Sequence, residues 1–201
     1  ICKNKAELRK RVKELMDTVG LAERLYNSYP HELDGGRRQR ICIARALAIN
    51  PKFIVCDEPV SALDVSIQAQ ILNLLMDLQE DMGLTYMFIT HDLSVVKHIS
   101  TEIMVMYMGN CVEKAPAKEL FENPVHPYTK ALLSAIPIPD ISMRTKKIQP
   151  IRGEVTSPID PAPGCRFAPR CDYCKENCVG SSIPLTEVSE GHFAACRLLE
   201  K

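Results

Sequence analysis

Three short runs of apolar residues recur in the middle of the chain, at Phe53–Cys56, Thr85–Thr90 and Ile103–Tyr107. Runs of this length, bounded by turn residues, are typical of buried strands. Around them, apolar residues recur at helical spacing over residues 6–19 and 66–82. Because helical and strand patterns alternate, we expect an α/β fold with a mainly parallel sheet and helices on both faces.

A further helix is predicted to begin at the pair Gly35-Gly36 and to continue to Ala48. A helix N-terminus preceded by glycines presents free backbone N–H groups and the positive end of the helix dipole, which together can bind an anion. Asp34, directly before the pair, is also a suitable N-cap residue for an ordinary helix. The pattern leaves both interpretations open.

Two adjacent carboxylates, Asp57 and Glu58, follow the first apolar run. The carboxyl ends of strands are where open α/β sheets bind their ligands. At such an edge one carboxylate can hold Mg²⁺ while the other handles water in phosphate chemistry. A plain acidic turn after the strand is the alternative.

The composition changes after Ile136-Pro137. Prolines dominate a segment with little periodicity, namely Pro139, Pro150, Pro158, Pro161, Pro163, Pro169 and Pro184. Five of the nine cysteines lie between Cys165 and Cys196. Without a secretory signal, clustered cysteines indicate metal binding before disulfides. We place a domain boundary near residue 138 and expect an irregular tail that, because it is poor in apolar residues, needs a cross-link or a metal.

Charge and length narrow the possible functions. The 201 residues carry 25 basic and 25 acidic side chains, so the balance gives no argument for binding nucleic acid or an anionic membrane. No apolar run approaches the roughly 20 residues of a membrane span. The chain begins with Ile rather than Met, and we expect it to be a piece of a longer protein.

Four motifs in series resemble the second half of an ABC-transporter nucleotide-binding domain. Leu33-Asp-Gly-Gly-Arg37 resembles the signature motif, and Phe53–Glu58 resembles Walker B. Ser61-Ala-Leu-Asp64 is similar to the D-loop, and His91 stands where the family has its switch histidine. Each motif alone is weak, but their order and spacing match the family from about residue 28 to 113. The resemblance implies a partial P-loop NTPase fold.

The resemblance also implies a role for each motif residue. Asp57 would hold Mg²⁺, Glu58 would act as general base on the attacking water, and His91 would contact the γ-phosphate of ATP. The remaining motif residues would bind nucleotide across a head-to-tail dimer of two ATPase subunits. These residues are Leu33, Asp34, Gly35, Gly36, Arg37, Ser61 and Asp64.

Asp34 departs from the family pattern, which usually has Ser at this position. An ionised carboxylate can only accept a hydrogen bond, whereas a hydroxyl can donate one to a phosphate. The carboxylate either weakens nucleotide closure or only caps the helix and points away. A second departure is that G-x-x-x-x-G-K-[ST] occurs nowhere in the sequence. Without that phosphate-binding loop we expect the chain alone to be inactive as an ATPase.

The tail resembles the C-terminal extension of oligopeptide and dipeptide (nickel) importer ATPases. The residues concerned are His126–Pro137 and Cys165–Cys171. The resemblance implies a 4Fe–4S cluster held by Cys165, Cys171, Cys178 and Cys196, with Cys174 as an extra thiol. Four thiolates suit structural zinc equally well, and Cys171-x-x-Cys174 keeps zinc open on spacing alone.

The resemblance to this family implies that the chain has three parts. Residues 1–50 would belong to the helical subdomain with the signature, 51–137 to the second half of the ATPase core, and 138–201 to a Cys-rich metal-binding extension. The expected partners are a second ATPase subunit, transmembrane permease subunits and, indirectly, a solute-binding protein, with no nucleic acid. The expected location is peripheral, on the cytoplasmic face of the cell membrane.

The function favoured by the resemblance is an ATP-hydrolysing subunit that powers peptide import. Two alternatives stay open at this stage. One is a non-catalytic or regulatory ABC subunit with a degenerate signature site and an iron–sulfur or zinc sensor tail. The other is a soluble ABC ATPase that acts on nucleic acid or in translation, which the tail and the neutral charge balance argue against.

Overall fold

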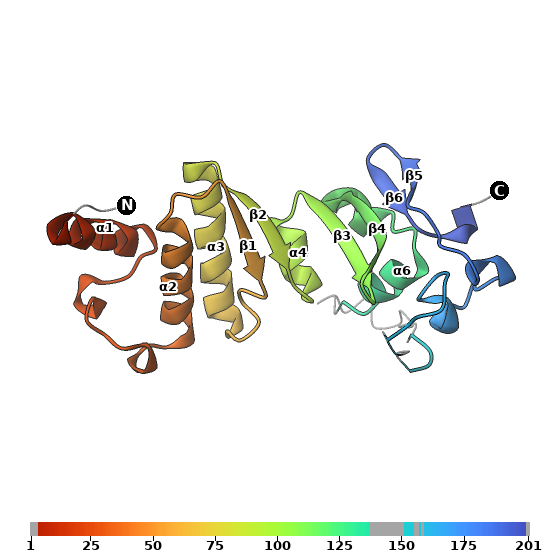
Figure 1. Cartoon of the computed structure of the whole chain (residues 1–201), viewed down its shortest axis with the longest axis horizontal. Coiled ribbons are helices and arrows are strands. Elements are labelled where there is room, and N and C mark those ends of the chain that lie inside the picture. The colour runs from red at the N-terminus through yellow and green to blue at the C-terminus, as the bar shows by residue number, and fades with distance from the viewer. Residues whose placement is uncertain (1–3, 137–150, 155–156, 158, 200–201) are drawn as a thin grey trace, which may run out of the picture. The chain divides into compact units, whose positions relative to one another are not determined.

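The computed structural model describes residues 4–136, 151–154, 157 and 159–199 (Figure 1). The chain forms two compact units, Ile1–His91 and Asp92–Lys201. Each unit is described by itself below. The boundary predicted near residue 138 lies outside the described residues, so the predicted division into three parts stays a prediction.

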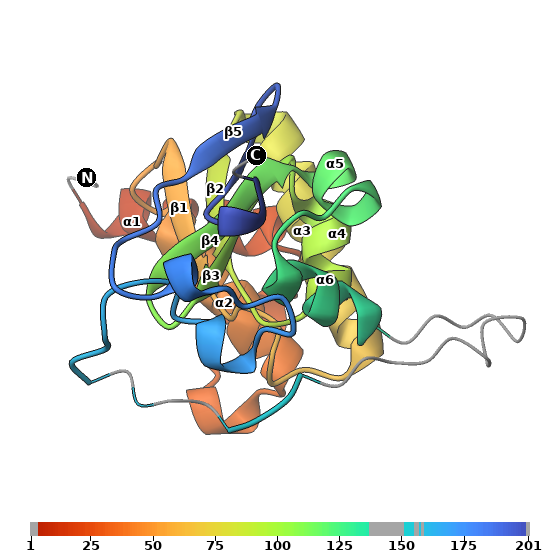
Figure 2. The ribbon, with the colours of Figure 1, turned by 90° about the vertical axis from the view of Figure 1, so that its right-hand side faces the viewer.

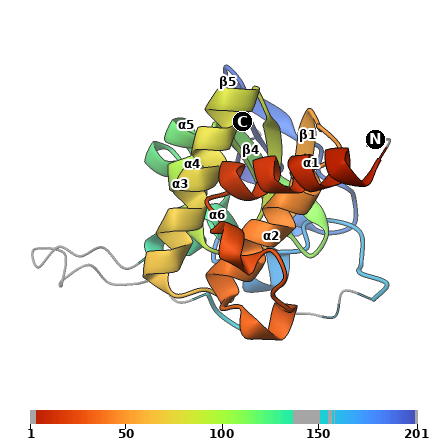
Figure 3. The same cartoon turned by 90° about the vertical axis from the view of Figure 1, so that its left-hand side faces the viewer.

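The first unit alternates helices and strands, as the periodicity predicts. Its elements are α1 (Lys5–Thr18), the 3-10 turns η1 (Glu23–Leu25) and η2 (Pro30–Glu32), α2 (Gly35–Leu47), β1 (Phe53–Asp57), α3 (Val65–Met82) and β2 (Thr85–Ile89). Figures 1 and 3 show α1, α2 and α3 as successive neighbours, with β1 and β2 beyond α3. The apolar stripes of these helices supply a core that includes Val19, Leu47, Ile71 and Leu75.

The ends of these helices follow their sequence signals closely. Gly20, just after α1, and Gly83, the residue that ends α3, both have left-handed φ values, +68° and +62°, which favour glycine. The side chain of Asp64, rather than that of the nearby Ser66, caps α3 and accepts the N–H of Ile67 at 2.9 Å.

Strands β1 and β2 are parallel, with Val55 opposite Met87 and Asp57 opposite Ile89. Their burial differs from the prediction of strands covered on both faces. Phe53 and Val55 on β1 are 53% and 50% exposed, and Met87 and Ile89 on β2 are both 46% exposed. The apolar runs predict strands that are covered on both faces, but the described residues cover only one face of β1 and β2.

The second unit is built on an antiparallel sheet. Its elements are α4 (Leu93–Ile99), β3 (Glu102–Tyr107), β4 (Asn110–Pro116), α5 (Ala117–Glu122), α6 (Pro127–Ser134), the 3-10 turns η4 (Ala168–Arg170), η5 (Glu176–Cys178) and η6 (Arg197–Leu199), and strands β5 (Thr186–Ser189) and β6 (His192–Ala194). The strand order is β3-β4-β6-β5. Figure 2 shows α5 and α6 beside the β3–β4 hairpin. The tail predicted to be irregular therefore extends this sheet by two strands.

One core holds the hairpin and the tail together. Ile103, Val105 and Val112 of the hairpin pack in the same buried cluster as Phe167 of the tail. The Tyr107 and Phe167 rings meet edge to face, with centroids 5.3 Å apart. The tail therefore gains its apolar burial by joining the hairpin core, in addition to any cross-link. No helix in the described residues is long and apolar enough to cross a membrane.

Candidate functional site

The carboxyl ends of β1 and β2 bring Glu58 and His91 together. The Glu58 N–H donates to the carbonyl oxygen of Ile89 at 2.8 Å, which extends the parallel ladder by one step. The His91 Nδ1 atom lies 2.9 Å from Glu58 Oε1. Asp57 is exposed at the same strand end. Three predicted site residues therefore share one edge of the sheet.

The Glu58 backbone has a conformation that is unusual for this residue type. Its φ is +44°, in the left-handed region, which is uncommon outside glycine and clusters at functional sites. The hydrogen bond from His91 is the main cause that lowers the pKa of the Glu58 carboxyl. The ionised carboxylate can only accept, so His91 Nδ1 carries the proton in this bond. His91 therefore holds one oxygen of the Glu58 carboxylate in a fixed orientation.

Asp34 caps α2 in this structure. Its Oδ1 accepts the backbone N–H of Arg37 at 2.8 Å, and its Oδ2 lies 3.3 Å from the Arg37 guanidinium. This is the capping role that the sequence left open beside the anion-binding role. Whether the carboxylate also weakens nucleotide closure stays a prediction.

The two signature glycines pack against the D-loop. A Cβ atom on Gly35 would lie 2.9 Å from Leu63 Cδ2, and one on Gly36 would lie 2.6 Å from Ile67 Cγ2. The glycines are therefore required for close packing of α2 on the start of α3, whatever they bind. The sequence analysis placed Leu63 inside the D-loop motif but assigned no role to Leu63 or Ile67, because neither residue carries a polar or ionisable group.

The rest of the D-loop is fixed by local hydrogen bonds. The Ser61 hydroxyl donates to the Glu58 carbonyl oxygen at 3.1 Å, so this segment follows directly from the strand end. Leu33, at the start of the signature, is only 4% exposed. The predicted signature, Walker B, D-loop and switch residues thus all lie in the first unit, in two linked groups.

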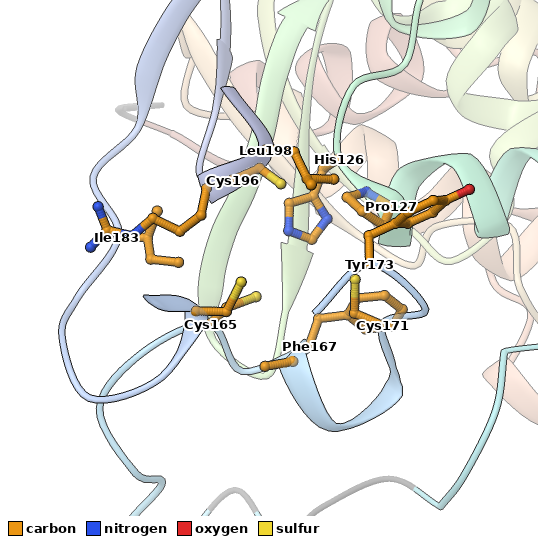
Figure 4. A pocket seen from close by; sticks show the side chains of 12 residues that line it. His126, Pro127, Cys165, Phe167, Cys171, Tyr173, Ile183, Cys196 and Leu198 are labelled. Carbon is orange, nitrogen blue, oxygen red and sulfur yellow. The ribbon is translucent and has the colours of Figure 1, made fainter. Parts of the chain in front are cut away.

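The clustered cysteines surround one small cavity in the second unit. It has a volume of about 20 Å³, and its lining includes Cys165, Cys171, Cys178, Cys196 and His126. Figure 4 shows the side chains of Cys165, Cys171, Cys196 and His126 around the same space. The four cysteines predicted to act together therefore converge, although the first and the last are 31 positions apart in the sequence.

Burial raises the pKa values of the Cys165, Cys171 and Cys196 thiols, and neighbouring cysteines raise them further. Thiolates that crowd together in this way require a cation to stabilise them. Within the described residues, no three His, Cys, Asp or Glu side chains are close enough to hold a metal ion. A single zinc ion would hold its sulfur ligands roughly 3.8 Å apart. The four thiols line the same cavity, but they are not close enough together to be ligands of one metal ion.

A buried acid and base join the tail to the hairpin next to this cavity. Glu113 on β4 and His192 on β6 are 0% and 1% exposed, and Glu113 Oε1 lies 2.8 Å from His192 Nε2. The Glu113 carboxylate also accepts the backbone N–H groups of Val125 at 2.7 Å and His126 at 2.9 Å. Burial lowers the pKa of the His126 imidazole to about 4, so this ring is neutral at pH 7. No motif in the sequence indicates this cluster, because its members come from distant segments.

Two family models match the chain. The model of the ABC transporter domain matches residues 2–61, and the model of the oligopeptide/dipeptide transporter C-terminal region matches residues 112–178. The two matches cover the segment with the signature and Walker B motifs and the segment that contains Glu113, Cys165, Cys171 and Cys178.

Several curated relatives are similar over almost all of the chain. The oligopeptide transport ATP-binding protein OppF of Haemophilus influenzae is 54% identical over 192 residues, which are 95% of this chain and 58% of the relative. OppF of Salmonella typhimurium is 54% identical over 96% of this chain and 58% of the relative. The dipeptide transport ATP-binding protein DppF of H. influenzae is 52% identical over 94% of this chain and 58% of the relative. The chain thus spans rather more than half the length of these proteins.

Solved structures with the same fold are ABC cassettes. The structure of cbiO1 from Clostridium perfringens, part of the ABC transporter complex cbiONQ, superposes with a TM-score of 0.55 at 31% identity, over 61% of this chain and 49% of that one. The cassette MJ0796, in a dimeric post-hydrolysis state bound to ADP and Pi, gives a TM-score of 0.52 at 36% identity, over 58% and 50%. The fold class is therefore confirmed as that of the ABC ATPases, within the P-loop NTPases.

Within that class, the chain belongs to the family of oligopeptide and dipeptide transport ATP-binding subunits, of which it matches the C-terminal part. This confirms the resemblance drawn from the signature, Walker B, D-loop and cysteine motifs.

Proposed function

We propose that this chain serves in an ATP-binding and ATP-hydrolysing subunit that powers the import of oligopeptides or dipeptides. The observation that carries the proposal is the contact between Glu58 and His91 at the ends of two parallel strands. The similarity to OppF and DppF proteins over more than nine tenths of the chain supports the choice of peptide as cargo.

Each group at the strand edge has a task that suits its chemistry. Glu58 accepts a proton from the attacking water, and the hydrogen bond from His91, which lowers the pKa of the Glu58 carboxyl, favours the ionised form that this role needs. His91 orients the Glu58 carboxylate through the 2.9 Å contact. Asp57 would hold Mg²⁺, which when bound neutralises charge on the phosphates.

The signature and the D-loop serve the partner subunit in this proposal. Leu33–Arg37 would approach nucleotide bound to a second ATPase subunit, with Ser61 and Asp64 along the interface. Since Gly35 and Gly36 are packed on Leu63 and Ile67, a movement of the D-loop would move the signature with it. Permease subunits at the cytoplasmic face of the membrane, supplied by a solute-binding protein, would complete the transporter.

The proposal is tested by comparing the chain with the transporter that contains it. The 201-residue chain has no phosphate-binding loop in its sequence, so we expect the chain alone to give no Mg-ATP hydrolysis. The transporter, reconstituted with its permeases and binding protein, is expected to hydrolyse ATP when peptide is supplied. Hydrolysis by the chain alone, or a transporter that ignores peptide, would contradict the proposal.

We also propose that Cys165, Cys171, Cys178 and Cys196 hold a 4Fe–4S cluster, with zinc as the competing occupant. The shared cavity supports a metal of some kind, because four thiols with few other polar neighbours line it. A cluster binds each thiolate through a different iron and so tolerates wider spacing than one ion does. When bound, it would cross-link segments of the tail and contribute stability.

A chain that binds an iron–sulfur cluster and a chain that binds zinc differ in metal content and in colour. Chain purified without oxygen is expected to contain iron and acid-labile sulfide in equal amounts and to absorb broadly in the visible range. Cys165→Ser should lose both, and Cys42→Ser, which changes an exposed cysteine elsewhere, should keep both. A colourless preparation with stoichiometric zinc would decide for zinc, and a metal-free wild-type chain would contradict both.

A further inference from the structure

Cys174 is the one clustered cysteine that does not line the cavity. Its side chain is exposed, whereas Cys178 is buried with 9% exposure. The two thiols nevertheless both bond to the backbone of Lys175. An accessible thiol therefore lies beside one of the four cavity thiols.

The backbone of Lys175 holds this pair of sulfur atoms. Its N–H donates to Cys178 Sγ at 3.4 Å, and its carbonyl oxygen accepts from Cys174 Sγ at 3.7 Å. The same carbonyl oxygen accepts the Cys178 N–H at 2.9 Å, which closes the short turn η5. The backbone of Lys175 thus bonds to both thiols and also fixes the backbone of Cys178.

We propose that Cys174 and Cys178 are a redox-active dithiol that oxidises to a disulfide and thereby removes Cys178 from the cavity. The oxidant is a hydroperoxide. The Cys174 thiol reacts with it to give a sulfenic acid and water, or an alcohol from an organic peroxide. The Cys178 thiol then attacks that sulfur, which forms the S–S bond and releases a second water.

The disulfide changes what the cavity can hold. Cys178 is one of the four thiols that line it, so after oxidation three remain. Under the proposed function of the cavity, an oxidised chain could not bind a four-thiolate cluster until a reductant restores Cys178. The formation of the disulfide itself does not depend on any bound metal.

A protease map can identify the disulfide, because Lys175 lies between the two cysteines. Trypsin cuts after Arg170, Lys175 and Arg197 and so places Cys171 and Cys174 in one peptide and Cys178 and Cys196 in another. A disulfide between Cys174 and Cys178 joins the two peptides, whereas one between Cys171 and Cys174 stays within the first. A Glu-specific protease then separates Cys178 from Cys196, because it cuts after Glu187 and Glu190.

The full chain, stripped of metal by a chelator, is treated with hydrogen peroxide and mapped by mass spectrometry. Oxidation is followed over hours. The expected product is the peptide pair joined through Cys174 and Cys178, which dithiothreitol releases. Cys174→Ser should abolish it, and Cys42→Ser, at an exposed thiol in another helix, should leave it unchanged.

Three results would overturn the inference. These are an oxidised chain without the joined pair, a main product between Cys171 and Cys174, or a joined pair that persists in Cys174→Ser. The same samples also test the cofactor proposal, through a separate measurement of their iron and sulfide content. Re-reduced wild-type chain should take up iron and sulfide when reconstituted without oxygen, and oxidised chain should not. If neither takes up metal, the cofactor proposal fails while the disulfide map still decides the inference.

Discussion

Replacement of Glu58 by Gln is expected to lower ATP hydrolysis by the assembled transporter by about 10²–10⁴-fold, the usual contribution of a general base. Gln has nearly the same shape as Glu, so the unusual backbone at φ +44° and the contact with His91 can persist. The amide cannot take a proton from water. Binding of ATP should therefore remain while turnover is lost.

Two further variants show whether the loss is specific. Glu80→Gln changes an exposed glutamate on α3, outside the strand edge, and should leave hydrolysis unchanged. His91→Ala removes the side chain that orients Glu58 and should lower turnover too. Phosphate release is measured at saturating ATP, and nucleotide binding is measured with a fluorescent analogue. If Glu58→Gln turned over like the wild type, another residue would have to be the base.

Replacement of Glu113 by Ala is expected to lower the free energy of unfolding by about 3–5 kcal/mol, as for other buried ion pairs that lose one partner. The change leaves His192 with only its longer contact to Glu119, at 3.7 Å, and removes the acceptor of the Val125 and His126 N–H groups. A buried donor without an acceptor keeps its full desolvation cost. We therefore expect the pairing of β6 with β4 to weaken first.

The matched control is Glu102→Ala on the neighbouring strand β3. Glu102 also forms an ion pair, with Lys114 at 3.0 Å, but its side chain is 54% exposed. Its loss should cost less than about 1 kcal/mol. Urea unfolding followed by circular dichroism gives both values. If Glu113→Ala failed to fold, Glu113→Gln and the exchange rates of the Val125 and His126 amide protons would still report on the cluster. Equal losses for Glu113→Ala and Glu102→Ala would contradict this account.

The sequence predicted local structure and motif chemistry well, because both depend on residues that are close along the chain. The glycines that follow α1 and end α3 and the cap formed by Asp34 lie within a few residues of the elements they affect. The placement of Glu58 beside His91 could also be predicted from the sequence. Parallel strands bring their carboxyl ends to one edge, and each residue directly follows a recognisable strand.

The sequence could not predict features that depend on distant partners. Glu113 and His192 are 79 positions apart, and neither belongs to a motif that points to the other. The tail was expected to be irregular, because its prolines hide two short strands. For the exposed face of β1, the sequence shows that partners are needed but does not identify them. Phe53 and Val55 indicate how apolar the face is, but not which residues cover it.

The position of β6 between β4 and β5 has a consequence for the time at which the sheet can form. A ribosome completes the β3–β4 hairpin long before it reaches His192, so one edge of β4 has no partner while the intervening residues are made. Closing such a long loop is slow, and an open strand edge can pair with another chain. The nascent protein therefore passes through a period in which the free edge of β4 can pair with another chain, and this period ends only when the residues of β6 emerge.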